Sequence, residues 1–419
     1  MGKHKKIISN ENKNSDSENN FGNSINKSIV WTIFVIGFMI IILSISSAIF
    51  PGLLISIIGD GEFLEPFEMS LIGPVIIIVS IIVISLVGLN RRLPKLFVEE
   101  LEKIFSFDLS RKNSLIFLMI ILAIYVSISA NELSIYELNQ YGDFLVVENA
   151  LEIWPDGKSD NIYVTEQLTR HVRMALLAIS DEIFDNIKII PYIASILLLV
   201  TTYFLAVSFS KKNISGLLAV ILVLQSSTFF TYDTIAVYEN FWVLFYVLSI
   251  YLIFQKPKLS SISYFLSIFS KAITVLMLPI TIIVTLLSEI PKKNKIFVVI
   301  SHLAILLIAI SIFQISDTVY GNVIDINMKD FMSGFTTLAF NLRFDVLLLV
   351  FILPISIGLF IKAKNGSREA ISMMVFMGGI ILVTPVLEMI TNFYFVYPYR
   401  YVPLVIFFAV AASSLISRK

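Results

Sequence analysis

The sequence predicts an all-α, polytopic membrane protein with about 12 transmembrane helices. The 419-residue chain is 57% hydrophobic and only 15% charged, whereas a soluble domain carries roughly 25% charged residues. Its mean hydropathy is +0.87. The apolar residues form long runs without charge, such as 29–50. Such runs match helices, which need about 20 apolar residues per crossing, and not barrel strands, which alternate over roughly 10 residues.

Twelve apolar segments are candidate crossings. They comprise residues 29–50, 69–89, 114–130, 189–208, 214–230, 238–254, 259–270, 272–288, 296–313, 345–361, 370–387 and 401–416. The two segments that meet at Lys271 have basic residues on both flanks, at Lys258 and Lys292. Because Lys and Arg accumulate in cytoplasmic loops, both flanks are expected on the same side. The chain would then cross twice, with the turn at Lys271 below the outer surface.

The distribution of charge predicts the orientation. With both termini in the cytoplasm, 23 of the 31 basic residues lie inside and 22 of the 31 acidic residues lie outside. An inner excess of Lys and Arg is the asymmetry that orients membrane proteins. We therefore expect a multi-pass protein of the cell membrane, with long outer loops at 131–188 and 314–344.

Composition divides the chain into three parts. Residues 1–28 are rich in Asn, Ser and Lys and too polar to bury a core, which predicts a disordered cytoplasmic tail. Residues 29–113 hold two crossings and a cytoplasmic linker, which we interpret as an accessory anchor. Residues 114–419 form the main transmembrane domain, with the 131–188 loop on its outer side.

Several functions are excluded by composition and motif content. Basic and acidic residues balance at 31 each, whereas a nucleic-acid partner would require a basic stripe. The chain has no cysteine, so disulfides, thiolate chemistry and cysteine metal sites are excluded. It also lacks a phosphate-binding loop, a dinucleotide glycine pattern and a nucleophile elbow, which argues against a nucleotide-driven pump.

The 131–188 loop contains two stretches with helical periodicity, 143–154 and about 165–184. Each has an apolar stripe opposite polar residues, as helices along a membrane interface do. Asp143 begins the first stretch, where it either caps the helix or offers a carboxylate for chemistry. Arg170 and Arg173 share a turn of the second.

Three features carry a family resemblance. The first is an Asp-x-x-x-x-x-x-Ala pattern in an outer loop after a span, Asp143 to Ala150. The second is the segment 260–287, with Ser-Lys-Ala at its centre around Lys271 and a proline beyond it, and the third is Tyr-Arg-Tyr-Val-Pro at 399–403. These features occur in the order typical of a known family and on the side of the membrane that the charges predict. On this basis the region of about 114–416 resembles the GT-C class of membrane glycosyltransferases. That class is related to protein O-mannosyltransferases and to bacterial lipid A sugar transferases.

The resemblance implies transfer of a sugar from a lipid-linked polyprenyl-phosphate donor to an acceptor at the outer face of the membrane. Inversion at the anomeric carbon needs a base for the acceptor hydroxyl, and a carboxylate is the usual choice. Asp143 is our candidate for this catalytic role. Phe144 stands where the class often has a second acidic residue, so a divalent metal cofactor stays an open question. The sugar and the acceptor are not identified by the sequence.

The leaving phosphate needs fixed positive charge at the membrane surface. Lys271 and Arg400 are the first candidates, with Arg173 as a third. The alternative for the first two is snorkelling of a cation towards the interface. For the arginines of the loop it is an ordinary helix salt pair, because Glu166 lies four residues before Arg170. Nearby aromatic residues are interpreted as interfacial anchors, with sugar stacking as the alternative: Tyr238, Trp242, Tyr397, Tyr399 and Tyr401.

Two other classes of function remain. A solute transporter or lipid flippase would place ionisable residues near the midplane of facing helices. The predicted spans are nearly free of charge in their centres. A non-catalytic membrane subunit would use the 131–188 loop to dock a partner.

Overall fold

The computed structural model describes residues 27–49, 72–90, 103, 106–315, 326–343, 345–391 and 398–416. All regular elements in these ranges are helices, and none of these residues forms a strand. The all-α prediction is therefore confirmed for this part of the chain. The tail predicted at 1–28 lies outside the described residues except for its last two, which begin the first helix.

Each predicted crossing falls on a helix, or on two consecutive helices. The helices in these segments are α1 (Lys27–Ile49), α3 (Ile72–Asn90), α5 (Arg111–Ser129), α9 (Ile189–Ser210), α10 (Asn213–Leu224), α11 (Ser227–Tyr232), α12 (Phe241–Gln255), α13 (Pro257–Ser270), η3 (Ala272–Met277), α14 (Leu278–Leu287), α15 (Lys292–Ile315), α17 (Val346–Lys364), α18 (Arg368–Thr391) and α19 (Val402–Ser414). Six of them, α1, α5, α9, α15, α17 and α18, are long and apolar enough to cross a membrane by length and composition. The larger number of crossings stays a prediction.

The predicted crossing at 214–230 is not one helix. α10 ends at Leu224, and α11 begins after Ser226, whose hydroxyl accepts a hydrogen bond from the backbone N–H of Phe229 at 3.1 Å. This cap starts a new helix because it satisfies a backbone donor that has no partner within the helix. The short α11 then reaches η4 (Pro398–Tyr401), the turn that precedes α19.

The second predicted outer loop contains a helix that the sequence analysis missed. α16 (Met328–Leu342) packs against α18 and α1 with apolar residues such as Phe335 and Leu338 and with small polar residues such as Ser333, all buried. Polar residues alternate with apolar ones along the helix, so the segment lacks the uniform hydrophobicity that marks a span. Its burial depends on neighbours that are distant in sequence.

Gly334 makes the contact between α16 and α18 possible. A Cβ atom at this position would lie 2.5 Å from the Cα of Pro385, closer than real contacts allow. We expect Gly334→Ala to destabilise the protein by about 1–3 kcal/mol, because the clash is with backbone that cannot rotate away. Gly37→Ala on α1 is the matched control, since nothing lies within 4 Å of its added carbon. Thermal unfolding in detergent would measure both, and equal stability of the two variants would contradict the prediction.

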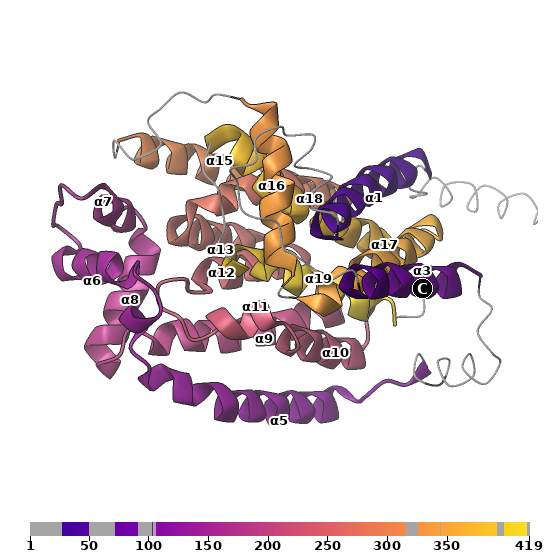
Figure 1. The fold of residues 1–419 in the computed structure, drawn as a ribbon, viewed down its shortest axis with the longest axis horizontal. Helices are drawn as coiled ribbons and strands as arrows, with labels where there is room; N and C mark the ends of the chain where they lie inside the picture. Colours follow the sequence, from indigo (N-terminus) through magenta and orange to yellow (C-terminus); the bar gives the residue numbers. More distant parts are fainter. Residues whose placement is uncertain are drawn as a thin grey trace, which may run out of the picture.

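The helices of the first long loop gather at one end of the molecule (Figure 1). They are α6 (Phe144–Ile153), α7 (Ile162–Leu168) and α8 (His171–Phe184), preceded by the short turns η1 (Ala130–Ser134) and η2 (Glu137–Asn139). The single helix predicted over 165–184 is wrong, because the chain breaks at Thr169 and Arg170. α8 packs against α9 and α13, which attaches this end of the molecule to the bundle.

Candidate functional site

Asp143 lies at the N-cap position of α6, but it does not cap the helix. No capping hydrogen bond is made by its side chain. Its Oδ2 instead accepts a hydrogen bond from the hydroxyl of Tyr238 at 2.7 Å. The residue is solvent-exposed. The carboxylate is therefore held by one hydrogen bond while it stays accessible to a ligand.

Tyr238 connects this carboxylate to the start of the last helix. Its ring stacks on that of Tyr399, with centroids 4.6 Å apart and an interplanar angle of 14°. Tyr232 packs edge-on against both rings, at 5.9 and 5.7 Å. The three tyrosines bring α11, the loop before α12 and η4 into contact.

The interpretation of these aromatic residues as interfacial anchors is wrong for those that the structure describes. Tyr238, Tyr399 and Tyr401 are at most 5% exposed, and Trp242 is fully buried. Anchors need a ring that faces the lipid head groups, and these rings face other protein groups. Tyr397 lies outside the described residues.

Lys271 lies where the sequence predicts a break. α13 ends at Ser270, Lys271 has extended backbone angles, and η3 follows directly. The side chain is 8% exposed, and its Nζ lies 3.9 Å from the centre of the Tyr399 ring. Snorkelling would carry the ammonium group out towards the interface. Here it points into the protein, onto the same tyrosine that stacks on Tyr238.

Arg400 also contacts Tyr399. Its Nε donates a hydrogen bond to the hydroxyl of Tyr399 at 3.3 Å. Lys271 and Arg400 are 129 positions apart in the chain, yet both contact one phenol. Asp143, Tyr238, Tyr399 and the two cations therefore form a continuous set of contacts, which we term the tyrosine-linked site.

Tyr399 is electrostatically unusual. Burial by itself would raise the pKa of its phenol, but the charges of Arg400 and Lys271 outweigh burial and lower the pKa from 10.0 to about 7. Two adjacent cations stabilise the phenolate, as an opposite charge does for any acid. The site therefore attracts negative charge at the position of the hydroxyl.

This pKa predicts a pH dependence for anion binding. Below pH 7 Tyr399 is a neutral phenol and cancels none of the positive charge of Lys271 and Arg400. Above pH 7 its phenolate opposes an incoming anion, so affinity for a lipid phosphodiester should fall by up to about tenfold per pH unit. Burial also lowers the pKa of Lys271 to about 8, so both proteins should lose affinity as the pH rises through that value. Between about pH 6 and pH 7.5, binding of a polyprenyl-phosphate sugar should be less pH-dependent in Tyr399→Phe than in wild type. The same slope in both proteins would refute the prediction.

Arg173 is buried among fixed partners. Its Nε donates to Oε2 of Glu239 at 2.8 Å, and both side chains are 1% exposed. Its Nη2 donates to the backbone carbonyls of Ala236 and Val237, and its Nη1 donates to the side chain of Gln167. Most of its N–H groups are therefore engaged within the protein. A role at the carrier phosphate stays a prediction for this residue.

Arg170 forms the salt bridge with Glu166 that the four-residue spacing predicts. It pairs with Glu166 and also donates to Gln167, so this amide oxygen bridges both arginines. Its side chain is 20% exposed. Arg170 thus lies closer to solvent than Arg173 does.

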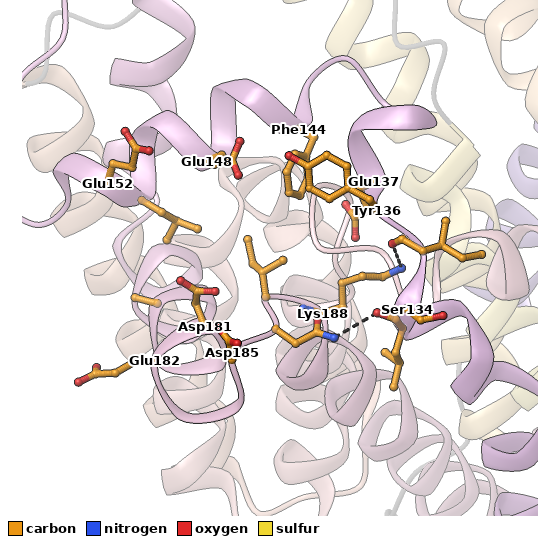
Figure 2. A pocket seen from close by; sticks show the side chains of 16 residues that line it. Ser134, Tyr136, Glu137, Phe144, Glu148, Glu152, Asp181, Glu182, Asp185 and Lys188 are labelled. Carbon is orange, nitrogen blue, oxygen red and sulfur yellow. Dashed lines mark hydrogen bonds between the residues drawn. The ribbon is translucent and has the colours of Figure 1, made fainter.

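An acidic cavity lies beside α6 (Figure 2). Its volume is about 620 Å³, and it is bounded by α6, α8 and the turns around η1 and η2. Six carboxylates line it: Glu137, Glu148, Glu152, Asp181, Glu182 and Asp185. Lys188, the one cation among the lining residues, donates to the backbone carbonyls of Glu132 and Ile135. The negative potential here opposes the binding of a phosphate group.

The described residues contain no group of three or more His, Asp or Glu side chains arranged to hold a metal ion. Comparison with protein-family models finds no match, and comparison with curated proteins and with solved structures finds none either. The case for a function therefore depends on the residues and their geometry.

Sequence analysis missed Glu137 and Glu239, which lie beside the site. Glu137 accepts a hydrogen bond from the backbone N–H of Val237, next to Tyr238, and Glu239 pairs with Arg173. Neither belongs to a recognised motif. One signal was present, since Asp233, Glu239 and Asn240 fall close together between two apolar runs. Polar residues at the end of a span often mark a functional region.

Proposed function

We propose that the protein is a membrane glycosyltransferase that transfers a sugar from a polyprenyl-phosphate carrier to an acceptor at the outer face of the cell membrane. Asp143 removes the proton from the acceptor hydroxyl. Lys271 and Arg400 bind the carrier phosphate and stabilise its negative charge as the sugar leaves. Both termini lie in the cytoplasm, and the chain crosses the membrane 12 times, as the spacing and charge of its apolar segments predict.

The observation that supports this proposal most directly is the tyrosine-linked site. A general base and two phosphate-binding cations must approach the same glycosyl donor from opposite sides. Asp143 and the two cations are far apart in sequence, and the stacked pair of Tyr238 and Tyr399 links them.

The position of the site along the helices favours transfer over transport. Lys271 follows the end of α13, Arg400 precedes α19, and Asp143 precedes α6. A transporter would need its ionisable groups in the centres of facing helices. The three residues instead lie next to helix ends, and Tyr238 and Tyr399 link them.

Purified protein incubated with labelled polyprenyl-phosphate sugars and cell-envelope acceptors tests the proposal. Wild type should transfer label from at least one donor, and Asp143→Asn should do so far more slowly. Equal transfer by both proteins would refute the role of Asp143. Reconstituted vesicles that move a labelled lipid without any bond change would instead support the flippase alternative.

Lys271→Met should weaken donor binding. Methionine matches the length of lysine but removes its charge, and the loss of one charge-assisted contact is expected to raise the Kd for a polyprenyl-phosphate sugar by about 10- to 100-fold. Lys258→Met on α13 is the control, because this residue is exposed. If both variants bind the donor like wild type, Lys271 does not contact the phosphate.

A further inference from the structure

The segment 235–240 between α11 and α12 is irregular, yet it is buried. Ala236, Val237, Tyr238 and Glu239 are each at most 5% exposed. A buried segment without regular structure must find partners for its backbone N–H and C=O groups outside itself. Those partners determine where Tyr238 lies.

Glu137 supplies the acceptors on one side. Its Oε1 accepts from the backbone N–H of Ala236 at 2.6 Å, and its Oε2 accepts from that of Val237 at 3.1 Å. The side chain is 1% exposed. One carboxylate thus accepts hydrogen bonds from two consecutive backbone N–H groups of the segment. Hydrogen bonds to a charged acceptor are short and roughly twice as strong as neutral ones.

Arg173 supplies the donors on the other side. Its Nη2 donates to the carbonyl oxygen of Val237 at 2.7 Å and to that of Ala236 at 3.3 Å. The same guanidinium pairs with Glu239. The N–H and C=O groups of the same two residues are therefore held by two side chains of opposite charge.

We propose that Glu137 and Arg173 are positioning residues that hold the segment 235–240 so that Tyr238 reaches Asp143. Tyr238 follows Val237 directly, and its hydroxyl is 2.7 Å from the Asp143 carboxylate. Glu137 lies in η2, only six positions before Asp143. One short stretch of chain therefore fixes both the carboxylate and the segment that carries its hydrogen-bond donor.

The catalytic part of this inference rests on the proposed function. If Asp143 is the base, release of the segment should lower kcat, because the carboxylate loses its orienting contact. KM for the lipid donor should change little, because Lys271 and Arg400 contact Tyr399 and make no contact with Glu137. A residue that only stabilises the fold would not separate these two constants.

The test compares Glu137→Gln with Glu152→Gln, the same chemical change at an exposed residue of α6. Hydrogen–deuterium exchange measures the amides of Ala236 and Val237, and nitration by tetranitromethane with mass spectrometry measures the accessibility of Tyr238. We expect Glu137→Gln to speed exchange of these amides by about tenfold or more and to increase nitration of Tyr238. Glu152→Gln should match wild type in both. If Glu137→Gln does not fold, Glu137→Asp replaces it, since the shorter side chain cannot reach both amides.

The kinetic arm measures transfer by the same variants. We expect Glu137→Gln to lower kcat by about tenfold while KM for the donor stays within about twofold. Unchanged exchange in Glu137→Gln would overturn the inference. Faster exchange with unchanged nitration of Tyr238 would overturn the positioning of Tyr238. If wild type transfers no sugar, the proposed function fails, and the exchange and nitration results still decide whether Glu137 holds the segment.

Discussion

The substitution Asp143→Asn is expected to reduce the rate of sugar transfer by about 10²- to 10⁴-fold, which is the range that a general base contributes. Asparagine has nearly the shape of aspartate, and its amide oxygen can still accept the hydrogen bond from Tyr238. It cannot accept a proton from the acceptor hydroxyl. The initial rate of transfer from a labelled polyprenyl-phosphate sugar measures the effect, while the Kd for the donor should stay close to that of wild type.

Two variants control this experiment. Glu152→Gln removes a carboxylate from α6, and we expect no change in rate because this residue is exposed and lies nine positions after Asp143. Tyr238→Phe retains the carboxylate but removes its one hydrogen bond to a tyrosine, and a loss of about tenfold is expected. If Asp143→Asn transfers sugar as fast as Glu152→Gln, the residue is not the base.

Arg173→Met is expected to destabilise the protein by about 3–5 kcal/mol, because removal of one partner of a buried pair leaves the other charge without its direct ion pair. Arg173 and Glu239 are both 1% exposed. In the described part of the chain, the second oxygen of Glu239 has no hydrogen-bond partner. Loss of the arginine would therefore leave the whole carboxylate without a hydrogen bond. Thermal or denaturant unfolding in detergent measures the change.

Arg170 offers the matched control, three positions earlier. Its pair with Glu166 is 20% exposed, against 1% for the pair of Arg173 with Glu239, so water can still reach the Glu166 carboxylate when the arginine is lost. Arg170→Met should therefore destabilise the protein far less than Arg173→Met. The double variant Arg173→Met, Glu239→Met should recover part of the stability, because no charge is then left buried. A double variant less stable than Arg173→Met alone would contradict this account.

Some of the site could be predicted from sequence because its signals are local. Lys271 interrupts a long apolar run, which already indicates a break, and the helices do separate there. Asp143 precedes an amphipathic stretch, and α6 begins at the next residue. A charge or a change of periodicity can be read from neighbouring residues alone.

The partners of these residues could not be predicted. Tyr399 is one of 16 tyrosines, and nothing in its immediate sequence indicates contact with both Lys271 and Tyr238. From the sequence, Arg173 is expected on the surface of a loop helix, where it could bind an anion. The structure instead buries it against Glu239, 66 positions away. α16 was missed for the same reason, since its apolar face is covered by helices from both ends of the chain.

The sequence by itself determined that this chain is helical and rich in apolar segments. It placed Lys271 and Arg400 at the ends of those segments and Asp143 at the start of an amphipathic stretch. Hydrophobicity belongs to single residues, and helical periodicity relates residues three or four positions apart, so both can be recognised in a short stretch of sequence. Only the tertiary structure decided that the carboxylate and the two cations meet through Tyr238 and Tyr399, and that Arg173 is held inside the protein. Such contacts depend on how helices pack, and packing is determined by the shapes of many distant side chains together.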